Sequence, residues 1–235
     1  MLTSILLSLL ISAPTPSDTI RVGDVTLRRP IIGTDTIDTY MMSDGDRRPV
    51  AVFVQTTTEA DGGYLVVQEN RGPSGALLTL DSIFLSDGSL ATSWHGDVTP
   101  EGSRHVRFSG NGRVRGVAVD TLGQESRIDE EIPAGLFDYS LLTLVADRLP
   151  LSAGYSATLA TYDITRGPIF ITLGVLAEET ISLGQESFDV WRMEIALGEQ
   201  TVTRWVERST GRELRWSVTF GAREMIGERR SGGRL

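Results

Sequence analysis

Residues 212–220 read RELRWSVTF, and from Glu213 onward polar and apolar side chains alternate strictly. In an extended strand, Leu214, Trp216, Val218 and Phe220 would lie on one face, and the charged and hydroxyl side chains on the other. This period of two is typical of an antiparallel sheet with one buried and one solvated face. The stretch therefore predicts a β-sheet whose inner face is apolar.

Similar short runs fill most of the chain and are separated by turn signals at intervals of about 8–12 residues, a spacing typical of all-β domains. Asp61-Gly62-Gly63 and Asn111-Gly112 are examples, and these residue types tolerate the positive φ that tight hairpins need. The predicted strands are 19–28, 36–42, 50–57, 63–70, 76–85, 90–96, 103–109, 112–119 and 123–131, and then 155–163, 168–177, 187–197, 200–208 and 212–220. We therefore predict an all-β fold.

The strand predicted at 168–177 is apolar on both faces. Alternation places Ile169, Ile171, Leu173 and Val175 on one side, and Phe170 and Leu176 on the other. We therefore expect both faces of this strand to be at least partly covered.

One good helix is predicted, at 138–148, and it is the candidate cover for that strand. Asp138 suits an N-cap, because its carboxylate can accept from the free amides of the first turn. Apolar residues then recur at helical spacing, and Pro150 ends the run. They are Leu141, Leu144, Val145 and Leu149. The helix joins strand groups 18–133 and 154–228 in a single domain, 18–228, which is followed by a flexible tail at 229–235.

Composition excludes several kinds of chemistry. The net charge is −9, and all 22 basic residues are Arg, scattered among acids; an acidic chain of this kind repels nucleic acid. The chain has no Cys, which excludes disulfides, thiolate zinc sites and a lipid-anchoring Cys. Hydrophobic residues make up 40%, enough for a substantial core.

The N-terminus begins with MLTSILLSLLISA, an apolar run followed by the turn-rich segment Pro14–Ser17. The run is shorter than the roughly 20 residues that span a bilayer, and it is typical of the apolar part of a secretory signal. Residues 1–17 are therefore interpreted as a signal peptide, although no Arg or Lys precedes the run. The alternative is a buried first strand or helix of a cytosolic protein.

Candidate catalytic and metal-ligating residues are few. His95 and His105 lie in neighbouring predicted strands, so their imidazoles could approach each other near Asp97 and Glu101. Two half-buried or exposed hairpin histidines are the simpler interpretation, because a metal site usually needs more ligands. The acidic run 129–131 is interpreted as a solvated strand edge. We expect no catalytic residues, no metal and no cofactor.

Aromatic residues gather in the last long strands and are the candidate ligand-binding residues. The predicted set is Trp191, Met193, Trp205, Trp216 and Phe220, with Leu141 and Leu144 from the helix as a partial lid. Such a set either lines a groove for an acyl chain or fills a core. By alternation, the charges of Arg192, Glu213 and Arg215 are expected to face water.

Three segments together carry a family resemblance. They are FDYS at 137–140 leading to LPL at 149–151, FDVWRME at 188–194 after Gly184, and WVE at 205–207 before ELR at 213–215. In this order they resemble a bacterial envelope domain of unknown function, similar in fold to periplasmic lipoprotein carriers of the LolA/LolB type. The resemblance covers about residues 20–225. It implies a strongly curved antiparallel sheet, a half-open barrel with a helix on its concave side.

These features together favour a soluble periplasmic or secreted protein, without an integral membrane segment, that binds a hydrophobic or amphipathic ligand. The alternative is a non-catalytic structural or protein-interaction module of the envelope, whose partner the sequence does not identify. An enzyme acting on envelope polymers is the third hypothesis.

Export gives the first prediction. Because the apolar run is short and turn residues follow it at once, we expect cleavage near residue 17. N-terminal sequencing of the protein purified from its host should start between about Pro14 and Thr19. Recovery of an intact Met1 in the soluble fraction would contradict export.

Overall fold

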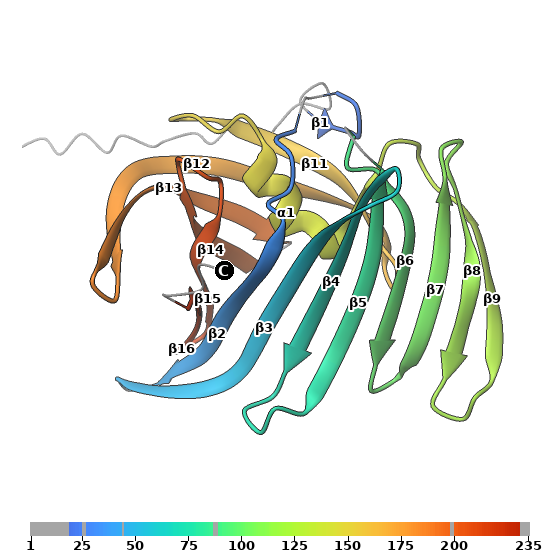
Figure 1. Cartoon of the computed structure of the whole chain (residues 1–235), viewed down its shortest axis with the longest axis horizontal. Helices are drawn as coiled ribbons and strands as arrows, with labels where there is room; N and C mark the ends of the chain where they lie inside the picture. The colour runs from blue at the N-terminus through green and yellow to red at the C-terminus, as the bar shows by residue number, and fades with distance from the viewer. Residues whose placement is uncertain (1–18, 25–26, 44, 87–88, 198–199, 231–235) are drawn as a thin grey trace, which may run out of the picture.

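The computed structural model describes residues 19–24, 27–43, 45–86, 89–197 and 200–230 (Figure 1). Within these residues the strands form one sheet with the order β1-β11-β12-β13-β14-β15-β16-β2-β3-β4-β5-β6-β7-β8-β9, and β10 pairs beside β11. Apart from β1 and β10, which pair parallel to β11, neighbouring strands are antiparallel. The all-β prediction is confirmed.

The first half of the chain forms a meander of eight strands and the second half one of six. Their bounds are β2 (Gly33–Ser43), β3 (Asp46–Ala60), β4 (Gly63–Arg71), β5 (Leu77–Ser86), β6 (Thr92–Thr99), β7 (Gly102–Ser109), β8 (Arg113–Asp120) and β9 (Glu125–Glu131), and then β11 (Ser156–Asp163), β12 (Gly167–Leu183), β13 (Glu186–Leu197), β14 (Gln200–Glu207), β15 (Glu213–Phe220) and β16 (Arg223–Arg229). Pairing of β16 with β2 joins the two meanders into one surface.

The sheet curls so strongly that its two ends overlap (Figure 1). On one face of β11, Leu159 contacts the main core; on the other, Ala160 and Tyr162 pack against Val106 of β7 and Val114 of β8. Two short strands, β1 (Thr19–Ile20) and β10 (Phe137–Asp138), cover the outer edge of β11. β11 is therefore the strand buried on both faces, and its edge is protected from further pairing.

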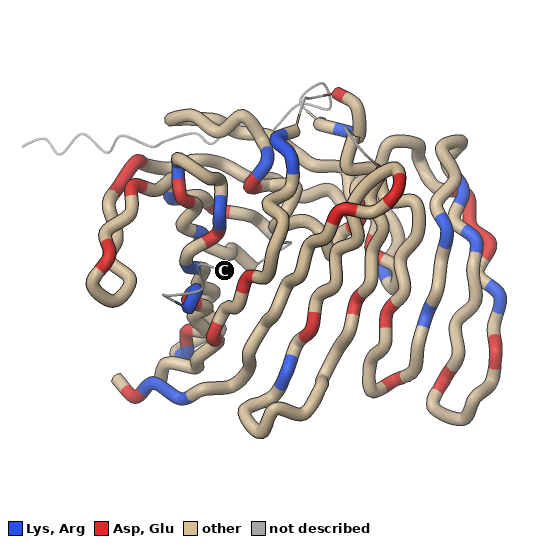
Figure 2. The backbone as a smooth tube through the Cα atoms, viewed as in Figure 1, with Lys and Arg blue, Asp and Glu red and all other residues tan. Residues whose placement is uncertain are grey.

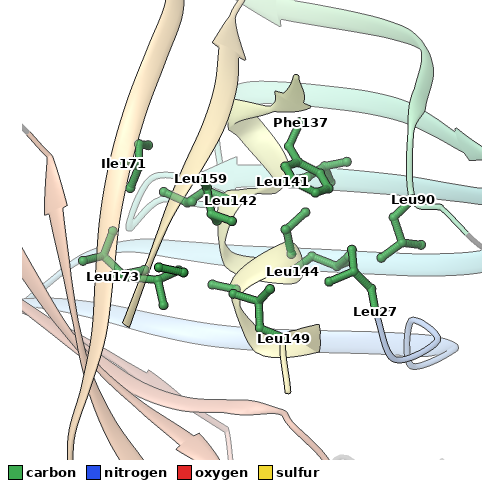
Figure 3. Close-up of a cluster of buried hydrophobic side chains, with 14 of the residues drawn as sticks. Leu27, Leu90, Phe137, Leu141, Leu142, Leu144, Leu149, Leu159, Ile171 and Leu173 are labelled. Carbon is green, nitrogen blue, oxygen red and sulfur yellow. The ribbon is translucent and has the colours of Figure 1, made fainter. Parts of the chain in front are cut away.

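The helical segment lies inside the curve, as expected (Figure 1). It consists of a 3-10 turn, η2 (Tyr139–Leu141), and α1 (Leu142–Arg148). Asp138 caps it, because its Oδ1 accepts from the Ser140 amide at 2.9 Å. The helix packs its apolar side onto strands from both meanders (Figure 3); this side comprises Leu141, Leu144, Val145 and Leu149, all buried. The predicted half-open barrel with a helix on its concave side is confirmed.

At both ends of the described part of the chain, the observed strands differ from the predicted ones. The strand expected at 19–28 is reduced to Thr19–Ile20, and β16 (Arg223–Arg229) was not predicted. Gly227 interrupts the alternation of β16, which is why the sequence pattern did not reveal it. The guanidinium of Arg230 donates two hydrogen bonds to Asp38, at 2.7 and 2.8 Å, so ordered pairing continues into the predicted tail. Residues 1–18 and 231–235, with the predicted signal peptide and most of that tail, lie outside the described residues.

The expectation that both faces of the strand at 168–177 are covered is wrong. Ile171, Leu173 and Val175 of β12 are buried, but Phe170 is 57% exposed and Leu176 is 51% exposed. The reason is the overlap of the sheet, because it covers the outer face of β11 and does not reach these residues. The strand covered on both faces is therefore β11, the neighbour of β12, and not β12 as we expected.

A β-bulge in β15 changes which face some of its side chains occupy, compared with the alternation that we expected. Trp205 pairs with Arg215 and Val206 with Glu213, so Leu214 is an extra residue. Leu214 consequently packs in a small cluster on the outer face with Val190, away from Trp216. The same bulge turns Glu213 inward, although we expected its charge to face water.

Burial of the helix gives a stability prediction. Leu144→Asp places an unpaired charge in the core, so we expect a loss of a few kcal/mol of unfolding free energy. Leu176→Asp, the matched control on the exposed face of β12, should change it by less than about 0.5 kcal/mol. Chemical denaturation measures both. Equal effects of the two substitutions would show that the helix is not packed as described.

Candidate functional site

The space that the helix leaves on the concave face forms a cavity of about 350 Å³. It lies between η2–α1 and the inner faces of β2–β4 and β13–β16. Its walls are largely apolar, with Val50, Ala51, Phe53, Leu142, Ile195, Val202, Trp216 and Met225. Polar side chains interrupt them at Thr39, Gln68, Asn70, Ser140, Thr143, Arg204 and Glu213. A mainly apolar cavity with a few polar groups is typical of small-molecule sites, which range over about 300–1,000 Å³.

The indole of Trp216 forms part of the wall because the neighbouring strand has a glycine opposite it. Trp216 pairs with Gly227 of β16. A Cβ atom on Gly227 would lie 2.1 Å from the indole Nε1, so any other residue would displace the ring. Gly227 therefore fixes the position of the indole in the cavity wall.

A buried charged cluster closes one end of the cavity. Arg204 of β14 is only 1% exposed, and its Nη1 lies 2.9 Å from Asp147 Oδ1. Its Nη2 donates to Asp147 Oδ2 at 3.2 Å, and its Nε donates to Glu213 Oε2. Burial raises the pKa of Asp147, and Arg204 opposes that rise. The cluster ties α1 to β14 and β15.

Hydrogen bonds connect the turn before β15 to the end of α1. Arg148, the last residue of α1, donates to the carbonyl oxygens of Thr210 at 3.1 Å and Gly211 at 2.9 Å. Gly211 has φ +70°, and a Cβ atom there would lie 2.7 Å from the Asp147 carbonyl oxygen. Only glycine permits this close approach, which holds Glu213 beside Arg204.

The structure brings only Trp216 of the predicted ligand-binding residues into the cavity wall. Met193, Leu141 and Leu144 are buried in the filled part of the core beside it. Trp191 packs against the edge of the same core, and the Arg208 guanidinium lies 4.5 Å from its ring centre.

Two predicted residues lie away from the cavity. Trp205 pairs with Arg192 and Arg215 on the outer face of the sheet, and its indole nitrogen donates to Glu179. Phe220, at the end of β15, is 41% exposed. Because side chains alternate along a strand, Trp205 and Arg204 must point to opposite faces, and only the latter faces the cavity.

Sequence reasoning missed most of the cavity wall, because β2–β4 are separated from β13–β16 by more than one hundred residues in the chain. One signal was present, since Arg204 occupies an apolar position between Val202 and Val206. A charged residue at such a position indicates a buried ion pair. The partners of that pair, Asp147 and Glu213, could not be chosen without the fold.

The two histidines lie on opposite faces of the sheet, so their imidazoles do not approach each other as they could have done. The simpler interpretation holds for His105, which is exposed, but is wrong for His95. His95 is buried, with Nδ1 2.9 Å from Asp138 and Nε2 3.0 Å from Asp81. His105 pairs with Gly96 on the outer face, and its ring centre lies 5.7 Å from that of Trp94. Over the described ranges, no group of three or more His, Asp or Glu side chains is arranged to hold a metal ion.

The acidic run 129–131 projects to alternate faces of β9. Asp129 accepts from Arg113 at 2.5 Å and from Arg127 at 3.1 Å, and the hydrogen bond to Arg113 lowers its pKa to about 2. Glu130 faces the other way and accepts from the Tyr162 hydroxyl at 2.9 Å. Figure 2 shows basic and acidic residues interleaved along β7–β9, the pattern of a solvated surface.

Fold and cavity together define an open, β-barrel-like domain with a helix and a small cavity inside its curve. The chain belongs to the family described as protein of unknown function (DUF3108), whose model matches residues 36–228. No curated protein matches the sequence significantly. No helix in the described part of the chain is long and apolar enough to cross a membrane.

Two solved structures are similar. One is a β-barrel-like protein of the domain of unknown function DUF1849 from Brucella abortus, with TM-score 0.50 and 13% identity over 85% of this chain and 97% of that chain. The other, described as "a putative lipoprotein from Parabacteroides distasonis", has TM-score 0.33 and 14% identity over 88% and 98%. The first similarity shows a shared fold. None of these descriptions names a catalytic activity.

The His95 cluster gives a pH prediction. Burial opposes the imidazolium charge, but hydrogen bonds to Asp138 and Asp81 outweigh it and raise the pKa of His95 from 6.5 to about 10. The stabilisation is therefore complete below about pH 6.5 and lost as the pH rises through about 10.

We expect His95→Gln to lower the unfolding free energy most at pH 6, and the deficit relative to wild type to shrink toward pH 10. His105→Gln, on the exposed face, should follow the wild-type profile. Urea unfolding at several pH values measures this. A deficit that stays constant with pH would show that the imidazolium is not the stabilising form.

Proposed function

We propose that this domain binds a small amphipathic molecule in the cavity between α1 and the concave face of the sheet, and that it acts by binding, not by catalysis. The observation that supports the proposal is the combination of an apolar wall, which includes Trp216, with a charged end at Arg204 and Glu213. An apolar tail would lie against the wall and a polar head against the charged end.

The size of the cavity restricts the ligand. A volume of about 350 Å³ is near the lower limit for small-molecule sites. It favours a compact molecule with one short tail over a lipid with several long chains. Burial of about ten methylenes contributes about 8 kcal/mol, and association costs at least about 4 kcal/mol. The tail alone would therefore give only about millimolar affinity, and the polar head has to contribute the rest.

The cell envelope is part of the same proposal. It is supported by the apolar N-terminal run and by the resemblance to periplasmic carriers of the LolA/LolB type. A soluble periplasmic protein with such a cavity would hold an amphipathic molecule away from water between two membranes or two enzymes. The half-barrel fold is compatible with this role, and Trp216 is the predicted ligand-binding residue that lines the cavity.

One observation favours a second candidate function. Phe170 and Leu176 are exposed large apolar side chains on the outer face of β12. Exposed apolar surface is typical of protein interaction sites. A structural or interaction module would use this face and leave the cavity without a ligand.

A fluorescent probe tests the first proposal. N-phenyl-1-naphthylamine, a neutral apolar probe, should bind with increased emission. Trp216→Ala should weaken its affinity about tenfold, equivalent to about 1.4 kcal/mol of lost contact. Val202→Phe should also weaken it, because the larger side chain occupies the cavity. Trp205→Ala, a matched tryptophan deletion on the outer face, should bind the probe like wild type.

Equal loss of binding in Trp216→Ala and Trp205→Ala would place the probe outside the cavity. Absence of probe binding to the folded wild-type protein would contradict the proposal and favour the interaction module. Circular dichroism of each variant establishes that the comparison is made between folded proteins.

A further inference from the structure

We infer that the cavity selects ligands whose polar head donates hydrogen bonds, an alkylammonium above all or an alcohol, over ligands with an anionic head. Glu213 is the residue that determines this selection. The inference rests on the proposed function, because it names the chemical class of ligand for the same cavity.

The positive charge at the end of the cavity is already paired. Arg204 donates from Nη2 to Asp147 Oδ2 and from Nε to Glu213 Oε2, and its Nη1 lies within ion-pair distance of Asp147 Oδ1 without a hydrogen bond to it. Nη1 also lies 3.4 Å from the carbonyl oxygen of Thr143. A carboxylate or phosphate head would have to displace one of these carboxylates to reach the guanidinium, and a buried charge that loses its partner is strongly destabilised.

The carboxylate of Glu213 has one oxygen that accepts no hydrogen bond from the described residues. Glu213 contributes Oε2 to Arg204, whereas its Oε1 has no hydrogen-bond partner among the residues that the structure describes. The side chain is 11% exposed and lines the cavity. A carboxylate oxygen that lines a cavity without a donor is a favourable place for an N–H or O–H group, and hydrogen bonds to an ionised group are about twice as strong as neutral ones.

The charge balance favours the same class. Arg204 and Glu213 are the charged residues among the described lining of the cavity, and Asp147 lies directly behind them. Two carboxyl groups therefore face one guanidinium; burial raises the pKa of Asp147 to about 7, so Glu213 carries the larger share of the negative charge at pH 7. The nearby Arg148 and Arg212 line a neighbouring pocket of about 40 Å³ with Asp35, which shares Arg204 and Glu213 with the cavity. Arg148 is directed to backbone carbonyl groups there.

The rest of the lining is compatible with a cation. Trp216 lies in the same wall, and an ammonium group close to an indole face gains about 0.5–2 kcal/mol. The hydroxyl groups of Ser140 and Thr143 offer further acceptors on the helix side. Beside the anionic Glu213, an anionic head would instead meet repulsion in a medium of low polarity.

Three ligands with the same ten-carbon tail test the inference, namely decylamine, decanol and decanoate. Each competes with N-phenyl-1-naphthylamine for the wild-type protein at pH 7, below the critical micelle concentration. We expect decylamine to bind at least about tenfold more tightly than decanoate, with decanol between them. Tighter binding of decanoate than of decylamine would overturn the inference while leaving the proposed function intact.

Glu213→Gln identifies the residue responsible. The amide oxygen can still accept from Arg204 Nε, but the negative charge is lost, so the preference for decylamine should fall to within about threefold. Glu194→Gln is the matched control, because Glu194 lies on the outer face of β13 between buried Met193 and Ile195. It should keep the wild-type preference. An unchanged preference in folded Glu213→Gln would overturn the role of Glu213.

The wild-type series decides the head-group class even where Glu213→Gln does not fold. Failure of the probe itself to bind contradicts the proposed function. Binding of the probe at Trp216 without competition from any of the three ligands contradicts only the inference. The two failures are therefore distinguishable.

Discussion

The structure depends on the burial of one side of α1 by strands from both halves of the chain. Inside the curve, residues of the helix and of strands from both halves of the chain form one buried cluster. Leu141, Leu144 and Val145 supply apolar volume from the helix and contact residues of β4, β5, β11 and β12 in this cluster. The overlap of β11 with β7 and β8, and the pairing of β16 with β2, hold the sheet in the curve that this helix requires.

The cavity follows from the same geometry. A helix of seven residues is about 10 Å long, whereas strands of eight residues or more extend over about 27 Å. The helix therefore covers only part of the concave face. The side chains on the uncovered part line the cavity. Gly227 and Gly211 keep the wall and the charged end of this space in place, since each allows a contact that a Cβ atom would prevent.

The charged cluster at Arg204 links the helix to the sheet and borders the cavity. Burying three charges is costly, and well-packed apolar residues could connect α1 to β14 at lower cost. Under the proposed function, these charges at the border of the cavity would recognise a polar head. The other buried ionic group, His95 between Asp81 and Asp138, lies at the N-terminal end of the helical segment, where Asp138 also caps η2.

The sequence alone determined the strands with regular alternation, the cap at Asp138, the helix that ends before Pro150 and the class of fold. These features depend on local chemistry, namely side-chain period, turn residues and capping, which a short window of sequence contains. Only the tertiary structure decided which aromatic residue faces the cavity. One bulge at Leu214 turns Glu213 toward the cavity, and Asp147, the other partner of Arg204, lies 57 residues away in the chain. The sequence pattern contains neither the bulge nor the pairing of distant strands, because both are set by how the whole sheet closes around α1.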